Sequence, residues 1–180
     1  MNSFLVDVSS ALSEPGASIE VDDEVPLGEV ECGDTLLVFE EPPRVSARLV
    51  RTDIGLVLSG TVTASAKVEC SRCLEPFVLT VVGAIEGGFN IPSVAPLTDI
   101  DEDWGDVVGE SVDLMPSIES AIRLEVPLAP VHDESCLGIC PTCGSDLNIE
   151  RCSCEVTAGE AAANPFAALK DLKHPVTPSE

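Results

Sequence analysis

The stretch IGLVLSGTVTASAKVE, residues 54–69, carries the clearest structural signal in the chain. Apolar or small residues recur at alternate positions, and mainly polar residues stand between them. The alternating apolar set is Ile54, Leu56, Leu58, Val62, Ala64, Ala66 and Val68. A period of two residues is typical of a β-strand with one buried and one exposed face. The stretch therefore predicts a long, half-buried strand at the centre of the fold.

The flanking segments predict the neighbours of this strand. RVSARLVR (44–51) precedes it and PFVLTVVGAI (76–85) follows it, so both are expected to pair with it in antiparallel fashion. ECSRCLEP (69–76) is then the turn between two strands. ASIEVDDEVPL (17–27) and DTLLVFEEP (34–42) read as two further strands.

A helix is predicted from about Asp113 to Glu125, with Asp113 as its N-cap and Pro116 in its first turn. Its apolar residues fall on one face. A shorter helix is predicted in DVSSALSEPG (7–16), and the Gly-, Pro- and Asp-rich residues 87–110 predict a long surface loop.

The composition limits the kind of core and the kind of partner. Hydrophobic residues make up 44% of the 180 residues but aromatic residues only 3%, so Val, Leu, Ile and Ala must fill the core. The chain has 32 acidic and nine basic residues, which gives a formal net charge of −23. This balance argues against a broad nucleic-acid surface and suits solubility or a basic partner.

The N-terminal residues show neither a basic start nor an apolar core, so no signal peptide is expected. No segment approaches the 18 apolar residues of a membrane span, so the chain is expected not to contact a membrane. The expected localisation is cytoplasmic, where cysteines are metal ligands or free thiols more often than disulfides.

Cysteine is the residue type that points to a specific chemistry. Cys70 and Cys73 form one C-x-x-C pair, and Cys140 and Cys143 form a second that is followed by Gly144. The remaining candidate ligands lie close to the second pair, and they are His132, Cys136, Cys152 and Cys154. Tetrahedral Zn²⁺ takes four nitrogen or sulfur ligands, and a C-x-x-C pair supplies two of them without strain. The pattern therefore predicts one or two structural zinc ions.

Other chemical roles of these cysteines fit the sequence less well than zinc binding does. Disulfides need an oxidising compartment, and a thioredoxin-type pair normally opens a helix. An iron–sulfur cluster could use Cys140, Cys143, Cys152 and Cys154. The candidate ligands divide into two sets of four, but a single ribbon-like site built from both C-x-x-C pairs is also possible. Cys32 stands alone and is expected to be a plain thiol.

These elements predict an α+β protein, in which a helix packs on an antiparallel, curved or barrel-like β-sheet and a small zinc-binding appendage follows. The expected domains are a β-rich core (1–130) and a cysteine-rich segment (131–155). Residues 156–180 would form a linker, a short helix in NPFAALKDLK and a disordered tail.

The succession of three motifs resembles the YceD-type family of large ribosomal RNA subunit accumulation proteins. These are VECSRCLEPF (68–77), VDLMPSIESAIRLEVPLAPVHDESC (112–136) and NPFAALKDLK (164–173). The similarity spans roughly residues 28–175. CLGICPTCGSDLNIERCSC (136–154) is similar to a cysteine-rich insert seen in many members of that family.

The resemblance implies a ligand pairing and a function. Some family members share the first C-x-x-C pair and the PVHD…C segment but lack the later cysteines, which implies a self-sufficient set of Cys70, Cys73, His132 and Cys136. The insert would hold a separable second set. The implied function is accumulation or processing of large-subunit ribosomal RNA and ribosome assembly, with no enzymatic activity and no small-molecule substrate.

The expected partner is a ribosomal RNA precursor, which suits the family better, or a basic large-subunit ribosomal protein, which suits the acidic charge better. For direct RNA binding, the candidate residues are Arg44, Arg48, Arg51 and Arg72. On a strand, the first two share a face and Arg51 points to the other.

Two other classes of function compete with this one. A zinc-stabilised adaptor between proteins would need no RNA. A metal-dependent enzyme acting on RNA would need acidic ligands, which DIDEDWGD (99–106) could supply. No Ser-His-Asp arrangement, phosphate-binding glycine loop or nucleotide fingerprint is present, so no catalytic residue is predicted.

Overall fold

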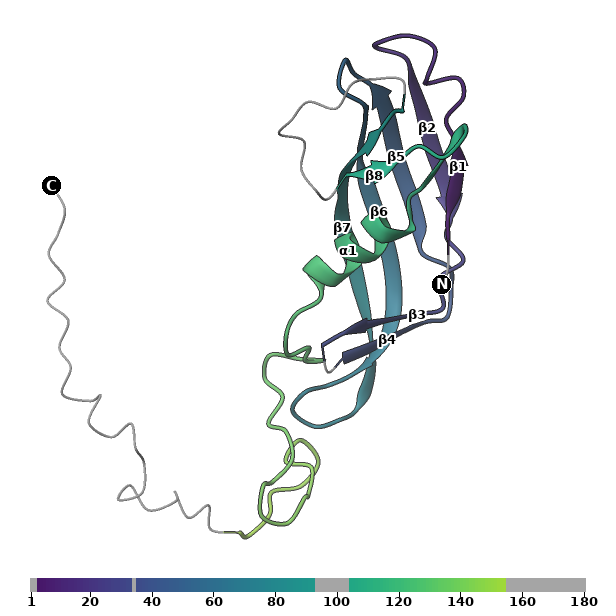
Figure 1. The fold of residues 1–180 in the computed structure, drawn as a ribbon. Coiled ribbons are helices and arrows are strands. Elements are labelled where there is room, and N and C mark those ends of the chain that lie inside the picture. The colour runs from purple at the N-terminus through teal and green to yellow at the C-terminus, as the bar shows by residue number, and fades with distance from the viewer. Residues whose placement is uncertain (1–2, 34, 93–103, 155–180) are drawn as a thin grey trace, which may run out of the picture. The chain divides into compact units, whose positions relative to one another are not determined.

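The computed structural model describes residues 3–33, 35–92 and 104–154 (Figure 1). The chain divides into two compact units, residues 1–136 and residues 137–180. The first unit contains all the helices and strands of the described residues. None of the described helices is long and apolar enough to cross a membrane.

The sheet of the first unit is built around β6 (Leu56–Glu69), the strand that the alternating stretch predicts. β7 (Pro76–Asn90) pairs with β6 along its whole length in antiparallel fashion. β5 (Arg44–Arg51) pairs with the first part of β6, and β4 (Thr35–Phe39) pairs near its end. The partners predicted from the flanking segments are therefore confirmed.

The outer strands leave the sheet open. β2 (Ser18–Glu24) extends the sheet beyond β5, and β3 (Glu29–Cys32) pairs with β4. β8 (Gly105–Asp106) adds a short parallel pairing at the end of β7. In the described part of the chain no pairing joins the β2 edge to the β7 edge, so the sheet is not closed into a barrel. The α+β class and the mainly antiparallel sheet are confirmed, and the barrel-like alternative is not.

Helix α1 (Met115–Glu125) lies against β7, β3 and β6 and covers the apolar face of the sheet (Figure 1). It buries Met115, Ile118, Ala121 and Ile122, the face that the sequence pattern indicates. The helix begins after Leu114 rather than after Asp113. The Asp113 carboxylate still accepts a hydrogen bond from the Met115 N–H at 3.0 Å, so it satisfies one free donor of the first turn.

Two predictions about irregular segments are wrong. The N-terminal segment forms β1 (Leu5–Asp7) and turns instead of a short helix, and β1 pairs with β9 (Ser111–Asp113). The predicted loop 87–110 contains the end of β7 and all of β8, while residues 93–103 lie outside the described residues.

The physical reason for the second error is the packing of Trp104 against β7. A Cβ atom added to Gly88 would lie 2.2 Å from Cε2 of the indole ring. Glycine is therefore required here so that the indole can approach the strand, and it does not mark a loop.

A second glycine of β7 fixes the distance between sheet and helix. A Cβ atom at Gly83 would lie 2.5 Å from the carbonyl oxygen of Ala121, which belongs to the backbone of α1. We expect Gly83→Ala to lower the free energy of unfolding by about 2–3 kcal/mol, because the helix must move away from the strand. Urea denaturation measures this change. Gly28→Ala is the control, since a Cβ atom there meets nothing within 4 Å, and equal losses in the two variants would contradict the expectation.

Candidate metal centre

The first group of candidate ligands joins two segments that are far apart in the sequence. Cys70 and Cys73 lie in the turn between β6 and β7, and His132 and Cys136 lie in the segment after α1. The ligand atoms of these four residues all lie within 4.8 Å of one another. The three cysteines are buried, while His132 is exposed.

Individual distances in this cluster match a tetrahedral site. The Sγ atoms of Cys70 and Cys136 are 3.9 Å apart, and the Sγ of Cys73 is 3.5 Å from the Nδ1 of His132. Zn–S bonds of about 2.3 Å and Zn–N bonds of about 2.0 Å give edges of about 3.8 Å and about 3.6 Å in a tetrahedron. The cluster therefore has the size and donor set of a Cys₃His zinc site.

The local backbone directs the two turn cysteines toward the same point. The N–H of Cys70 donates to the Glu75 carbonyl at 3.0 Å, and the N–H of Leu74 donates to the Cys70 carbonyl at 2.9 Å. Leu74 has a φ of 64°, in the left-handed region. The N–H of Arg72 points at the Cys70 sulfur at 3.5 Å. This tight turn places both sulfur atoms on one side of the chain, as a metal site requires.

Arg72 connects the two halves of the cluster. Its guanidinium donates hydrogen bonds to the carbonyl oxygens of Glu134 (2.8 Å) and Cys136 (2.9 Å). The N–H of Ser71 donates to the Pro130 carbonyl at 2.8 Å, which adds a second link between the same segments. Sequence reasoning assigned Arg72 to RNA and missed this role, because the receiving carbonyls lie more than 60 residues away in the chain.

These hydrogen bonds predict that Arg72 supports metal binding. We expect Arg72→Ala to weaken zinc affinity by about 10–100-fold, as loss of an outer partner of a metal site typically does. Competition with a chelating dye measures the affinity. The control is Arg48→Ala, which removes an arginine from the sheet and should leave zinc affinity unchanged. Equal affinity in the Arg72 variant and the wild type would contradict the role.

Burial, hydrogen bonds and neighbouring thiols shift the pKa values of Cys70 and Cys73 in opposite directions. Burial raises the pKa of Cys70, but hydrogen bonds from the backbone N–H groups of His132 and Arg72 help to lower it to about 5. The N–H of Glu75 lowers the pKa of Cys73, but burial and the two neighbouring cysteine sulfur atoms raise it to about 11. Metal ligands must be deprotonated, so a bound cation would favour the thiolate form of Cys73 as well.

The second group of candidate ligands lies entirely in the second unit. The sulfur atoms of Cys140, Cys143, Cys152 and Cys154 also lie within 4.8 Å of one another. Hydrogen bonds with the side chain and backbone of Ser145 lower the pKa of Cys143 to about 6. A hydrogen bond with Cys143, together with burial, raises the pKa of Cys154 to about 12. The donor set is that of a Cys₄ site.

The two C-x-x-C turns have the same backbone pattern. The N–H of Cys140 donates to the Ser145 carbonyl and the N–H of Gly144 donates to the Cys140 carbonyl, both at 2.8 Å. Gly144 has a φ of 73° and occupies the position that Leu74 occupies in the first turn. Each turn belongs to a different group of four candidate ligands, one group in each unit. Both clusters are compatible with zinc.

The four arginines proposed for RNA do not come together. Arg44 and Arg48 share the exposed face of β5, but Glu24 and Glu20 of β2 lie directly opposite them. Arg44 forms an ion pair with Asp22 at 2.9 Å.

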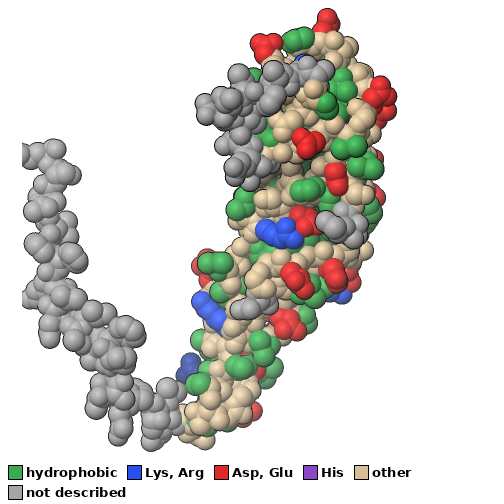
Figure 2. Space-filling model, viewed as in Figure 1, with side chains coloured by type: hydrophobic (Ala, Val, Ile, Leu, Met, Phe, Trp, Pro, Cys, Tyr) green, Lys and Arg blue, Asp and Glu red, His purple; other side chains and the backbone are tan. Residues whose placement is uncertain are grey.

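The other two arginines lie at opposite ends of β6. Arg51 is opposite Leu56, the first residue of that strand, and Arg72 follows its last residue, Glu69. On the face shown in Figure 2, acidic side chains are widespread and Lys and Arg side chains are few. This face therefore shows no continuous basic surface.

The remaining sequence candidates are Cys32, the acidic segment 99–106 and the predicted helix 164–173. Cys32 lies outside both clusters, at the end of β3. Most of the acidic segment 99–106 and the predicted helix at 164–173 lie outside the described residues.

A known protein family matches most of the chain. The model of the family described as large ribosomal RNA subunit accumulation protein YceD matches residues 58–173. An uncharacterized protein of Mycobacterium tuberculosis is 34% identical over 148 residues, which cover 81% of this chain and 71% of that protein.

Plant relatives carry the family name. The large ribosomal RNA subunit accumulation protein YCED homolog 1, chloroplastic, of Arabidopsis thaliana is 24% identical over 157 residues, which cover 72% of this chain and 49% of that protein. No solved structure matches the chain. The family match includes most of β6, the turn with the first C-x-x-C pair and all eight candidate ligands, and the chain thus belongs to the YceD family of large ribosomal RNA subunit accumulation proteins.

Proposed function

We propose that this chain is a non-enzymatic factor for large-subunit ribosomal RNA accumulation that acts by binding a basic ribosomal protein. The family supports the ribosomal role. The observation that favours a protein partner is the charge distribution, in which acidic residues of β2 stand opposite the β5 arginines. Phosphate groups would be repelled by a chain of net charge −23, whereas a basic protein would be attracted.

Zinc is the metal that we propose for both clusters, with a structural role. Four protein ligands complete a tetrahedron and leave no position for a water molecule or a substrate. In the first unit the ion would tie the turn between β6 and β7 to the segment after α1. This arrangement supports a binding protein better than a metal-dependent enzyme.

Affinity purification with and without ribonuclease tests the proposed partner. A tagged chain is isolated from cells of the source organism, and the captured proteins are identified by mass spectrometry. We expect a basic large-subunit ribosomal protein that stays bound after ribonuclease treatment. Depletion of the chain should lower large-subunit relative to small-subunit ribosomal RNA.

A double variant distinguishes binding to a protein partner from binding to RNA. Arg44→Ala/Arg48→Ala removes the exposed arginines of β5 and should leave the capture unchanged. Direct cross-links to RNA that this variant abolishes would contradict the proposal. Capture of an unrelated enzyme or transcription protein, with normal ribosomal RNA, would instead indicate an adaptor.

A further inference from the structure

One edge of β7 has no partner strand in the described part of the chain. β6 pairs with β7 along one edge from Pro76 to Phe89. On the other edge, β8 pairs only with Phe89 and Asn90. Residues 76–88 therefore present an open strand edge, the kind of backbone that other chains can extend by hydrogen bonding.

The register indicates which backbone groups face this edge. The N–H of Cys70 donates to the Glu75 carbonyl, and hydrogen-bonded pairs alternate along an antiparallel ladder. By this alternation the N–H and C=O groups of Val78, Thr80 and Val82 point away from β6.

Natural sheet edges are usually protected by lysine, proline or a bulge. Residues 77–85 contain no charged residue and no proline, and their register with β6 is continuous. Nothing in the sequence of this stretch therefore hinders pairing with another strand.

Exposed apolar side chains follow the same edge. Leu74, Val78 and Val82 are each more than half exposed, at 58%, 59% and 58%. We call residues 74–82 the edge strip. At its start, Leu74 and Pro76 line a cavity of about 660 Å³.

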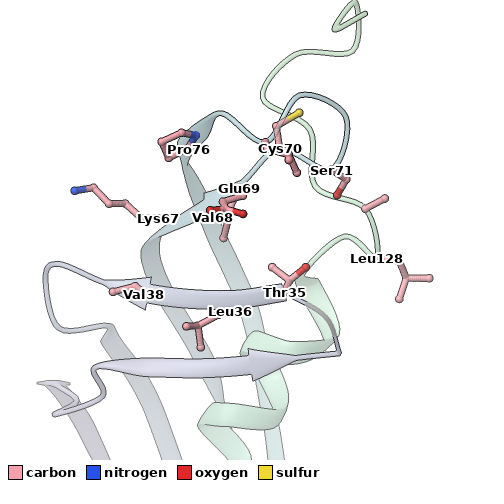
Figure 3. A pocket seen from close by; sticks show the side chains of 12 residues that line it. Thr35, Leu36, Val38, Lys67, Val68, Glu69, Cys70, Ser71, Pro76 and Leu128 are labelled. Atoms are coloured by element: carbon pink, nitrogen blue, oxygen red, sulfur yellow. The ribbon is translucent and has the colours of Figure 1, made fainter. Parts of the chain in front are cut away.

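The cavity is open to solvent, and residues from several neighbouring elements line it (Figure 3). Leu36 and Val38 of β4 and Leu128 after α1 contribute apolar atoms to its lining. Because β4 reaches β6 from the edge opposite to β7, this cavity lies beside the start of the edge strip and not along its open edge.

The acidic residues around the edge strip indicate which kind of partner can bind there. Glu69 lines the cavity, Glu75 lies within the edge strip and Glu86 lies farther along β7. Lys67, the basic residue of the cavity lining, is paired with Glu40. A second copy of the chain would bring another −23 charge to this surface, and RNA would bring phosphates. A basic segment is the complementary partner.

We propose that the edge strip binds an extended segment of a basic protein, in which large apolar residues alternate with lysine or arginine. The segment adds a strand to β7, lays its apolar side chains along Val78 and Val82, and places its cations near the flanking glutamates. This inference rests on the proposed function, since it specifies how the basic partner is held.

The first test uses a synthetic peptide of nine alternating lysine and valine residues and the full chain. Fluorescence anisotropy measures the affinity, and hydrogen exchange locates the contact. We expect protection of residues 74–82 when the peptide binds. A peptide with the same sequence but N-methyl groups on alternate amides keeps its charge and cannot pair as a strand. It should bind at least about tenfold more weakly, a difference of about 1.4 kcal/mol.

Matched variants test the edge strip itself. Val78→Lys/Val82→Lys adds two charges to the edge strip, and Leu5→Lys/Val108→Lys adds two charges at exposed apolar positions elsewhere. We expect a loss of affinity of about tenfold or more for the first pair and little change for the second. Leu74→Gly removes an exposed apolar side chain of the edge strip at a left-handed position that suits glycine, so it should weaken binding while the zinc content stays unchanged.

Three results would overturn the inference. These are equal binding of the N-methylated peptide, equal affinities of the two double variants, and protection of the edge strip that grows with protein concentration in the absence of peptide. The last result would identify a second copy as the occupant. If Val78→Lys/Val82→Lys still captures the ribosomal protein from cells, the edge strip is excluded while the proposed function stands.

Discussion

The variant Cys140→Ser/Cys143→Ser is expected to lose all hydrogen-exchange protection between residues 137 and 154. The described part of the second unit has no helix or strand and only one isolated bridge, between Ile139 and Asp146. Its apolar side chains are largely exposed, with Ile149 at 85%. A segment without a hydrophobic core folds only when a metal holds it, so loss of the ligands should unfold it completely.

Hydrogen exchange and elemental mass spectrometry on the same samples check this result. The zinc content should fall from two ions per chain to one, and protection of the β-sheet should stay unchanged. Thr142→Ser/Ser153→Ala changes two exposed residues between the ligands and serves as the control. Protection of residues 137–154 that persists after the zinc is lost would contradict a metal-dependent fold.

The variant Cys70→Ser/Cys136→Ser is expected to lose the other zinc ion and to destabilise the first unit. Both cysteines are buried, and they join the turn between β6 and β7 to the segment after α1. We expect the free energy of unfolding to fall by on the order of 5 kcal/mol. That loss is smaller than the roughly 10–16 kcal/mol of zinc-finger peptides, because the sheet and α1 retain their own core.

Thermal unfolding with and without a chelator measures this loss. Cys32→Ser is the matched control, since this thiol lies outside both clusters and its removal should change neither zinc content nor melting temperature. Two variants with the same melting temperature, or a wild-type protein that a chelator leaves unchanged, would show that the first cluster does not stabilise the fold.

Local patterns were sufficient to predict most of the elements. The alternation in residues 54–69 predicted β6, because a strand with one buried face repeats every two residues whatever its surroundings. The apolar face of residues 114–122 predicted α1 within two residues for the same kind of reason. The spacing of the cysteines predicted the ligand types, since a C-x-x-C turn is a local structure.

The errors concern residues whose roles depend on distant contacts. Gly88 was predicted to lie in a loop, because glycine is common in turns. In the structure it lies in β7 and allows the Trp104 indole to approach the strand. Arg72 was predicted to contact RNA, since its acceptors, the carbonyls of Glu134 and Cys136, are remote in sequence. Neither role leaves a signal in the neighbouring residues.

The sequence by itself determined the long central strand, the helix that covers it, the acidic charge and the eight candidate ligands. These properties follow from local periodicity and composition, which act on each segment separately. Only the tertiary structure decided that, in the described part of the chain, the sheet stays open, β7 has no partner strand along most of one edge, and Cys70 meets Cys136 from 66 residues away. Those features depend on strand order and register, which are set by contacts between segments that no local pattern encodes.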